Sequence, residues 1–199
     1  MARRLRKREY EVDLEDYQVR NLLRVAEVEG MEYWLCWAYL IHGLRFGEAV
    51  GERALPGIHM EDFYWQDGLV KITGKGYQGG LVQKVFQPVH SGVLEATREY
   101  RSQNQGKLFT MPPRTFRYHF KRQCKRAEIP GWEESHPHRL RHWFSNAVRP
   151  HTRDAFELMD LMRHSKKSLQ RVFGATVVYV VETKRRRELT LKALEPILG

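Results

Sequence analysis

Apolar residues near the start of the chain recur at the spacing of a helix. Four of them lie three or four positions apart on one face, at Val19, Leu22, Leu23 and Ala26. Asp13, with Asp16 one turn later, marks a helix start, and Gly30 ends the run. The pattern therefore predicts an amphipathic helix from about Asp13 to Gly30.

The next segment is apolar on nearly every side. Residues 31–41 contain two tryptophans, two tyrosines and several aliphatic residues, a composition typical of a helix that crosses the centre of a core. Gly43 ends this helix, and a third helix is expected over residues 44–51. Arg45 and Glu48 would lie one turn apart on one face of that helix.

The period of the pattern then changes from that of a helix to that of a strand. Residues 59–65, 69–73 and 81–86 are rich in aromatic and β-branched side chains and are separated by glycine-containing turns. They predict a three-stranded antiparallel sheet. The second connection, residues 74–80, contains four glycines and Lys75, so Lys75 is expected at or beside the tip of a mobile hairpin.

The rest of the chain returns to helical spacing. Helices are expected over residues 92–103, 113–127, 137–148 and 152–162, with two short helices from about residue 167 to the end. The predicted fold class is α+β, mainly α, with a small three-stranded sheet. Residues 1–9 are so densely charged that we expect a solvated, disordered arm, and residues 10–199 are expected to form one domain.

The composition narrows the class of partner. Among 199 residues, 34 are Lys or Arg and 24 are Asp or Glu, which gives a formal charge of +10. No apolar run approaches the roughly 20 residues of a membrane span. Cys36 and Cys124 form no CxxC pattern and are interpreted as reduced packing residues, which excludes a disulfide scaffold. A basic chain of this kind favours nucleic acid as partner, and unspecific adhesion to polyanions is the alternative.

The densest group of chemically active residues begins at His138. On a helix, His138, Arg141 and His142 share a face at spacings of three and four, while apolar residues between them anchor the helix in the core. Burying these groups together is costly without an anion, so a phosphate or a carboxylate is expected there. A solvated basic helix face is the alternative. A zinc site is disfavoured, because Arg139 stands where the HExxH pattern requires Glu.

Two further positions are ambiguous when each is taken alone. Arg45 and Glu48 have the spacing of an ordinary surface salt bridge. His164 follows an apolar run and has the position of an ordinary helix-end histidine. Their order along the chain, taken together with the other motifs, favours a functional role for both positions.

The order of these motifs resembles the catalytic domain of the tyrosine recombinases, the DNA integrases and site-specific recombinases, over roughly residues 13–190. A Gly-Leu-Arg box followed by Glu, a Gly-Lys-Gly hairpin, a His-x-x-Arg-His box and a later His occur in the family's order. The residues that carry the resemblance are Gly43, Leu44, Arg45, Glu48, Gly74, Lys75, Gly76, His138, Arg141, His142 and His164.

The resemblance implies a role for each matched side chain. Arg45 and Arg141 would bind the non-bridging oxygens of one DNA phosphate, with His164 as a further donor. Lys75 would protonate the departing 5′-oxygen. His138 would assist the nucleophile or hold the phosphate, and Glu48 and His142 would support these residues. The implied reaction needs no metal, no ATP and no other cofactor.

The nucleophile is the main departure from the family pattern. At the family's usual distance after His164 stands Phe173, which cannot attack phosphorus. Tyr179 is the nearest downstream tyrosine, and its Thr-rich approach resembles that of the family nucleophile, so it is our candidate. Two alternatives remain open: Phe173 replaces the tyrosine in an inactive protein, or Tyr179 merely fills the core.

The implied partner is double-stranded DNA, on which such proteins assemble as dimers or tetramers. The residues Arg3, Arg4, Arg6, Lys7 and Arg8 of the arm would contact the DNA. A separate N-terminal core-binding domain is not expected, and the last helix is a candidate for exchange between protomers. We expect a cytoplasmic, nucleoid-associated protein of prokaryotic, viral or plasmid origin, with no membrane partner. An inactive DNA-binding protein and a type IB topoisomerase or resolvase are the alternative functions.

Overall fold

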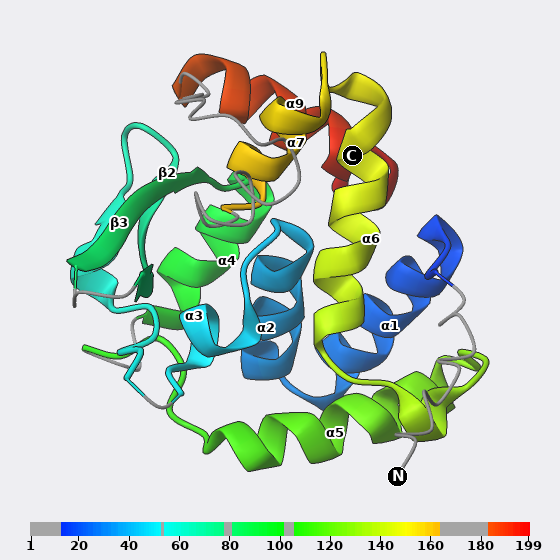
Figure 1. Cartoon of the computed structure of the whole chain (residues 1–199). Helices are drawn as coiled ribbons and strands as arrows, with labels where there is room; N and C mark the ends of the chain where they lie inside the picture. Colours follow the sequence, from blue (N-terminus) through cyan, green and yellow to red (C-terminus); the bar gives the residue numbers. More distant parts are fainter. Residues whose placement is uncertain (1–12, 53, 78–80, 102–105, 164–182) are drawn as a thin grey trace, which may run out of the picture.

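Helix α2 runs through the middle of the fold, and the other helices surround it, with the sheet on one side (Figure 1). The computed structural model describes residues 13–52, 54–77, 81–101, 106–163 and 183–199. The α-helices are α1 (Asp16–Glu29), α2 (Met31–Ile41), α3 (Phe46–Val50), α4 (Ser91–Arg101), α5 (Pro113–Arg126), α6 (His138–Val148), α7 (Ala155–Leu161) and α9 (Thr183–Leu198). Short 3-10 turns span Met60–Asp62, Trp132–Glu134 and Arg149–His151. The predicted fold class is confirmed.

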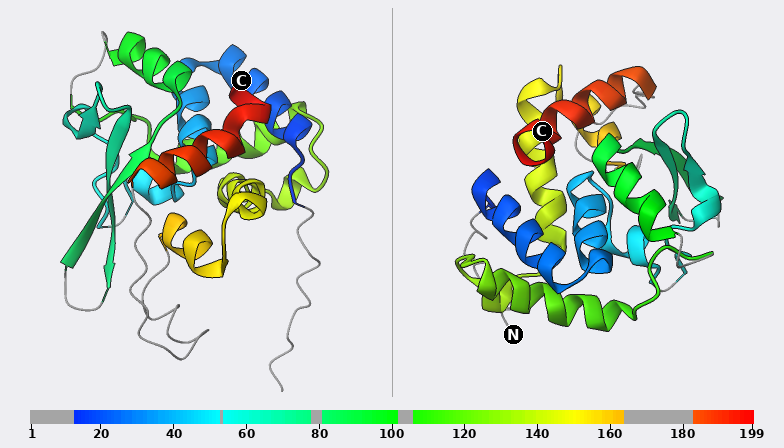
Figure 2. Two further views of the ribbon diagram at one scale, coloured as in Figure 1. Left: turned by 90° about the horizontal axis from the view of Figure 1, so that it is seen from above. Right: turned by 180° about the vertical axis from the view of Figure 1, so that it is seen from behind.

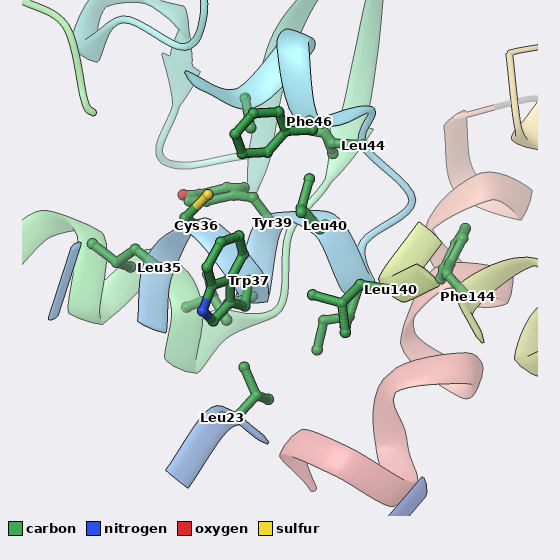
Figure 3. Close-up of a cluster of buried hydrophobic side chains, with 14 of the residues drawn as sticks. Leu23, Leu35, Cys36, Trp37, Tyr39, Leu40, Leu44, Phe46, Leu140 and Phe144 are labelled. Carbon is green, nitrogen blue, oxygen red and sulfur yellow. The ribbon is translucent and has the colours of Figure 1, made fainter. Parts of the chain in front are cut away.

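The core forms around α2, as its all-round apolar pattern predicts. Trp37 and Tyr39 of this helix are completely buried, together with most of their neighbours (Figure 3). The indole Nε1 of Trp37 donates to Gln123 Oε1 of α5 at 2.6 Å, so its polar atom is satisfied inside the core. Cys36 and Cys124 are free thiols buried in the same core.

The sheet has the predicted three antiparallel strands but different boundaries. The strands β1 (Phe63–Tyr64), β2 (Leu69–Tyr77) and β3 (Leu81–Pro88) lie in that order. The expected strand at residues 59–62 was wrong, because a 3-10 turn closes there when His59 N–H donates to Asp62 Oδ2 at 3.0 Å. The hairpin of β2 and β3 extends away from the helices (Figure 2).

Lys75 lies inside β2 and not in the connection that the glycines predicted. Pairing with β3 runs as far as Gly74 opposite Gln83 and resumes at Tyr77 opposite Leu81, with an irregularity between. Glycine is compatible with an extended backbone when a partner strand supplies hydrogen bonds. Of the two expected positions, at the tip of the hairpin or beside it, the structure gives the second: Lys75 lies in the strand, two residues before β2 ends at Tyr77.

Several helix boundaries differ from the sequence predictions. Helix α1 begins at Asp16 rather than Asp13, because Glu15 N–H donates to the side chain of Gln18 at 3.0 Å and caps the helix there. Helix α7 begins at Ala155, where Asp154 accepts from Glu157 N–H at 2.8 Å. Of the two short helices expected after about residue 167, the second is the helix α9, which spans Thr183–Leu198. The other helix expected after residue 167 lies outside the described residues, as does the predicted arm.

Helix α9 packs on its own domain. It lies against α6, α1 and β3, and buries Leu189, Thr190 and Leu194 completely (Figures 1 and 2). Arg186 of α9 pairs with Asp160 of α7 at 2.9 Å. The exchange of this helix between protomers stays a prediction, and it would expose this apolar surface. Within the described part of the chain, no helix combines the length and apolarity that spanning a membrane requires.

Gly43 forms the tight turn between α2 and α3. Its φ of +82° lies in the left-handed region, and a Cβ atom built there would lie 2.5 Å from Cδ1 of Phe144 on α6. The residue therefore meets two constraints, one on the backbone conformation and one on the space between the turn and α6.

We predict that Gly43→Ala lowers the free energy of unfolding by about 2–4 kcal/mol, the sum of left-handed strain and a clash with Phe144. Gly131→Ala is the matched control, because Gly131 has a φ of +66° with nothing within 4 Å of the added Cβ. It should lose only about 1–2 kcal/mol for the strain. Chemical denaturation measures both losses, and equal losses would contradict the proposed clash.

Candidate functional site

Arg45 and Glu48 are joined where α3 begins. The backbone N–H of Arg45 donates to Glu48 Oε2 at 2.8 Å, and Nη1 of its side chain donates to Oε1 at 2.7 Å. The Glu48 side chain is completely buried, whereas that of Arg45 is 34% exposed. The predicted pair is therefore partly buried, and Glu48 fixes the guanidinium of Arg45 while leaving one side of it accessible.

Arg141 reaches the same turn from α6. Only 3% of the residue is exposed, and its guanidinium donates to the backbone carbonyls of Gly43 and Met162. Among the residues that the structure describes, no carboxylate lies within ion-pair distance of Arg141. A buried positive charge that is held only by neutral acceptors favours the binding of an anion.

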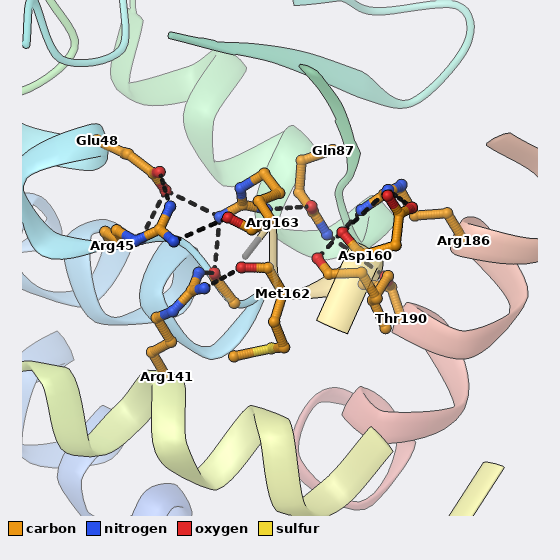
Figure 4. Close-up of polar contacts among 11 residues, drawn as sticks. Arg45, Glu48, Gln87, Arg141, Asp160, Met162, Arg163, Arg186 and Thr190 are labelled. Atoms are coloured by element: carbon orange, nitrogen blue, oxygen red, sulfur yellow. Dashed lines mark hydrogen bonds and ion pairs between the residues drawn. The ribbon is translucent and has the colours of Figure 1, made fainter. Parts of the chain in front are cut away.

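A third guanidinium, that of Arg163, completes the group (Figure 4). Its Nη2 donates to the Gly43 carbonyl at 2.7 Å and to Glu48 Oε2 at 2.9 Å. Its Nη1 donates to Gln87 Oε1 of β3 at 2.7 Å. We call Arg45, Glu48, Arg141 and Arg163 the arginine cluster.

The two arginines that the sequence predicts to share one phosphate converge in the structure. Arg141 binds the carbonyl of Met162, and Arg45 Nη2 binds the next carbonyl along the chain, that of Arg163, at 2.9 Å (Figure 4). Their charged ends therefore meet at one turn, although 95 residues lie between the two arginines in the sequence. The cluster holds three guanidinium groups and one carboxylate, which leaves an excess of two positive charges.

The pKa shifts reflect this charge balance. Burial alone would raise the pKa of Glu48, but Arg163 and Arg45 outweigh it and hold that pKa at about 2. Burial, assisted by Arg163 and Arg45, lowers the pKa of Arg141. Because a guanidinium starts from so high a pKa, we treat Arg141 as charged at neutral pH.

His138, the first residue of α6, is half-buried beside this cluster. Burial lowers its pKa to about 4, with a further contribution from the charge of Arg141. The ring is therefore neutral at pH 7 and can accept a proton or a hydrogen bond. His142, one turn later, is exposed, and its ring lies edge-on to that of His138 with 5.1 Å between centroids.

The remaining predicted residues lie on β2 or outside the described part of the chain. Lys75 is placed on β2 only through its backbone. The predicted sites at His164 and Tyr179 lie outside the described residues, as do Phe173 and the arm residues Arg3, Arg4, Arg6, Lys7 and Arg8. Their roles stay predictions. Within the described ranges, no group of three His, Cys, Asp or Glu side chains is placed to hold a metal ion.

Sequence reasoning missed Arg163 and Gln87. Arg163 follows the apolar run that ends at Met162, so a single charged residue after that run was the available signal. Its burial and its φ of +53° cannot be deduced from the pattern. Gln87 lies just beyond the predicted strand of residues 81–86, and nothing in the sequence shows that it is completely buried.

The fold is that of the integrases and tyrosine recombinases. The chain is similar to XerA recombinase, with a TM-score of 0.64 and 17% identity over 89% of this chain and 63% of that one. It is also similar to the Tn1549 transposon integrase, solved in complex with circular intermediate DNA, with a TM-score of 0.59 and 15% identity over 89% of this chain and 64% of that one. The integrase from mycobacterium phage Brujita is similar with a TM-score of 0.54 and 21% identity over 95% of this chain and 59% of that one.

The sequence itself identifies the family. The model of the phage integrase family matches residues 13–173, which is most of the chain. The chain therefore belongs to the phage integrase family. A comparison with curated protein sequences gives no match. The chain spans about three fifths of the length of the solved proteins to which it is similar.

A buried histidine, His42, directly precedes the Gly43 turn. His42 Nδ1 lies 2.6 Å from the carbonyl of Ala38, and His42 Nε2 accepts from His90 N–H at 2.9 Å. Because Nε2 accepts a hydrogen bond, the ring must be neutral and carry its proton on Nδ1. Burial lowers the pKa of His42 from 6.5 to about 4.

We predict that His42 makes the protein less stable as the pH falls from 6.5 toward 4. In this range the unfolded state binds a proton on His42 that the folded state does not, so the stabilisation is complete above pH 6.5 and lost below it. The loss is about 3 kcal/mol. Denaturation of His42→Gln at several pH values should show a smaller loss toward acid, whereas the exposed-site control His151→Gln should retain it. An unchanged pH dependence in His42→Gln would contradict this assignment.

Proposed function

We propose that this protein is a site-specific DNA recombinase or integrase that cleaves and rejoins DNA strands through a 3′-phosphotyrosine intermediate. The observation that carries the proposal is the position of Arg141, which is buried beside Arg45 and has no carboxylate partner among the described residues. An excess of buried positive charge favours a bound anion. Membership of the phage integrase family supports a DNA phosphodiester as that anion.

Both arginines suit the charge that develops during cleavage. A guanidinium has five N–H donors, and the contacts of Arg141 with Gly43 and Met162 use two of them. The remaining donors, with those of Arg45, would bind the two non-bridging oxygens of the phosphate. These oxygens carry more negative charge in the pentacoordinate transition state than in the ground state, so the arginines would stabilise the transition state preferentially.

The chemical step is a transesterification. The hydroxyl oxygen of Tyr179 attacks phosphorus as the bond from phosphorus to the 5′-oxygen breaks. The neutral ring of His138 can accept the tyrosine proton or hold the phosphate, and the ammonium group of Lys75 donates a proton to the 5′-oxygen. One phosphoester bond replaces another, so the 5′-hydroxyl of a second strand can reverse the step. The proposed reaction consumes no ATP and requires no metal.

The proposed partner is double-stranded DNA. A formal charge of +10 favours a polyanionic partner, and the Tn1549 integrase, similar in fold, was solved with DNA. The arm residues would add phosphate or groove contacts. Exchange of strands between two DNA sites requires more than one protomer, so self-association on DNA is part of the proposal.

A second function is favoured by one residue. Phe173 stands at the usual position of the family nucleophile, and it has no hydroxyl group. If Tyr179 does not replace the missing tyrosine, the protein would bind DNA through the arginine cluster without cutting it. The two functions differ in whether a covalent adduct forms.

We predict that the protein forms a covalent adduct with a nicked suicide substrate and that Tyr179→Phe abolishes it. Arg141→Ala should lower the rate of adduct formation by about 10²- to 10³-fold, because it removes donors to the transition state. Arg24→Ala, which removes an exposed charge of α1, is the matched control and should form adduct at the wild-type rate. Denaturing gels of labelled DNA measure the rates, and mass spectrometry of the DNA-linked peptide identifies the nucleophile.

Two results would contradict the proposal in different ways. Tight DNA binding with no adduct would support the non-catalytic function instead. An adduct on a residue other than Tyr179 would retain the chemistry but overturn the assignment of the nucleophile.

A further inference from the structure

Arg163 shares an acceptor with each of the two arginines that are proposed to bind the phosphate. It binds Glu48 Oε2 at 2.9 Å, while Arg45 binds the same carboxylate through Oε1 at 2.7 Å. It also binds the Gly43 carbonyl at 2.7 Å, to which Arg141 donates as well. A single side chain is therefore coupled to both arginines through their own partners (Figure 4).

The conformation of Arg163 is one that a side chain adopts at a cost. Its φ of +53° lies in the left-handed region, where a residue with a Cβ is disfavoured by about 1–2 kcal/mol relative to the usual conformation. Glycine would adopt it freely. Strain of this kind persists where surrounding contacts fix it, and here the contacts of the guanidinium do so.

Among the described residues, Arg163 has a carboxylate partner, Glu48, and Arg141 has none, so the charge of Arg163 is already balanced within the protein. Its Nη1 is directed into the core, to the completely buried Gln87 of β3 at 2.7 Å. Gln87 in turn donates to Thr190 of α9 at 3.4 Å. Any effect of Arg163 on the chemistry must therefore pass through the residues that it holds.

We propose that Arg163 is a positioning residue, which orients Arg45 and Arg141 toward one phosphate. By donating to one oxygen of Glu48 and to the Gly43 carbonyl, it limits the hydrogen bonds that these acceptors can make to the other two arginines. This inference rests on the proposed function. Without Arg163, Glu48 would be free to bind the guanidinium of Arg45 with both oxygens, and the Gly43 carbonyl would be free to hold Arg141 more fully. The two guanidinium groups would then be drawn toward the protein and away from the phosphate.

The decisive variant is Arg163→Gly, because glycine fits the left-handed backbone and the side chain is removed without adding backbone strain. Arg163→Lys keeps a buried positive charge but cannot reach three acceptors with a planar fork. Circular dichroism and thermal unfolding establish that each variant is folded. If Arg163→Gly does not fold, Arg163→Lys provides the same comparison with a smaller expected loss.

The first measurement is the rate of adduct formation as a function of DNA concentration. For Arg163→Gly we expect the rate at saturating DNA to fall about 10- to 100-fold, because transition-state contacts weaken. The DNA concentration at half-maximal rate should change less than about threefold, because Arg163 does not contact DNA. Arg163→Lys should lie between wild type and Arg163→Gly.

A double-mutant cycle with Glu48→Gln tests whether Arg163 acts through Glu48. In the Glu48→Gln background, Arg163→Gly should lower the rate at saturating DNA by less than about threefold, because the competing carboxylate is already neutral. A merely structural role would give the same loss in both backgrounds, and that result would overturn the proposal.

A second readout separates this inference from the proposed function. Inorganic phosphate should raise the melting temperature of the wild-type protein relative to chloride at equal ionic strength, and this rise should disappear in Arg163→Gly and in Arg141→Ala. If wild type forms no adduct, the proposed function fails, and the dependence of phosphate binding on Arg163 still decides the inference. If wild type forms adduct and Arg163→Gly matches it in rate and in phosphate response, the inference fails and the proposed function stands.

Discussion

The carbonyl oxygen of Gly43 accepts hydrogen bonds from two buried guanidinium groups, those of Arg141 and Arg163. This contact brings the end of α2, the face of α6 and the residues after α7 to one point. It depends on the glycine, because the left-handed turn directs the carbonyl inward and the absence of a Cβ allows Phe144 to pack against the turn. The rest of the cluster is arranged around this oxygen.

The cluster is stable only because its charges are partly balanced from within. Glu48 is the single carboxylate among the described members, and it is shared by two arginines while Arg141 has neutral carbonyls as partners. Desolvating a guanidinium costs free energy that carbonyl groups offset only in part. The remaining excess of positive charge accounts for why a phosphodiester is the ligand we propose, and why a solvated basic helix face does not describe Arg141.

The main features of the fold could be predicted because they follow from local patterns. The apolar residues of α2 predicted a central helix, and the aromatic and β-branched residues of 59–65 and 69–73 predicted two strands of the sheet. The residues 74–76 misled the prediction because glycine favours turns in isolation, whereas pairing with β3 decides where the strand ends. The start of α1 depends on a hydrogen bond between Glu15 and Gln18, which competes with equally plausible caps nearby.

The candidate site was predictable to the extent that it follows family motifs. Arg45, Glu48 and Arg141 were identified from the order of short boxes, and the structure brings them together. Arg163 was not identifiable, because its role arises from tertiary contacts with Glu48 and Gly43 and from a backbone angle that no local pattern encodes. The lowered pKa of His138 likewise depends chiefly on its burial in the fold, which no local pattern shows.

The most direct test of the central claim is a crystal structure of the Tyr179→Phe protein bound to a DNA duplex that contains its cleavage site. The account predicts that guanidinium nitrogens of Arg45 and Arg141 lie within about 3 Å of oxygens of the same scissile phosphate, with Arg141 still bound to Gly43. A complex in which the phosphate contacts Arg45 alone, while Arg141 binds only protein carbonyls, would contradict it.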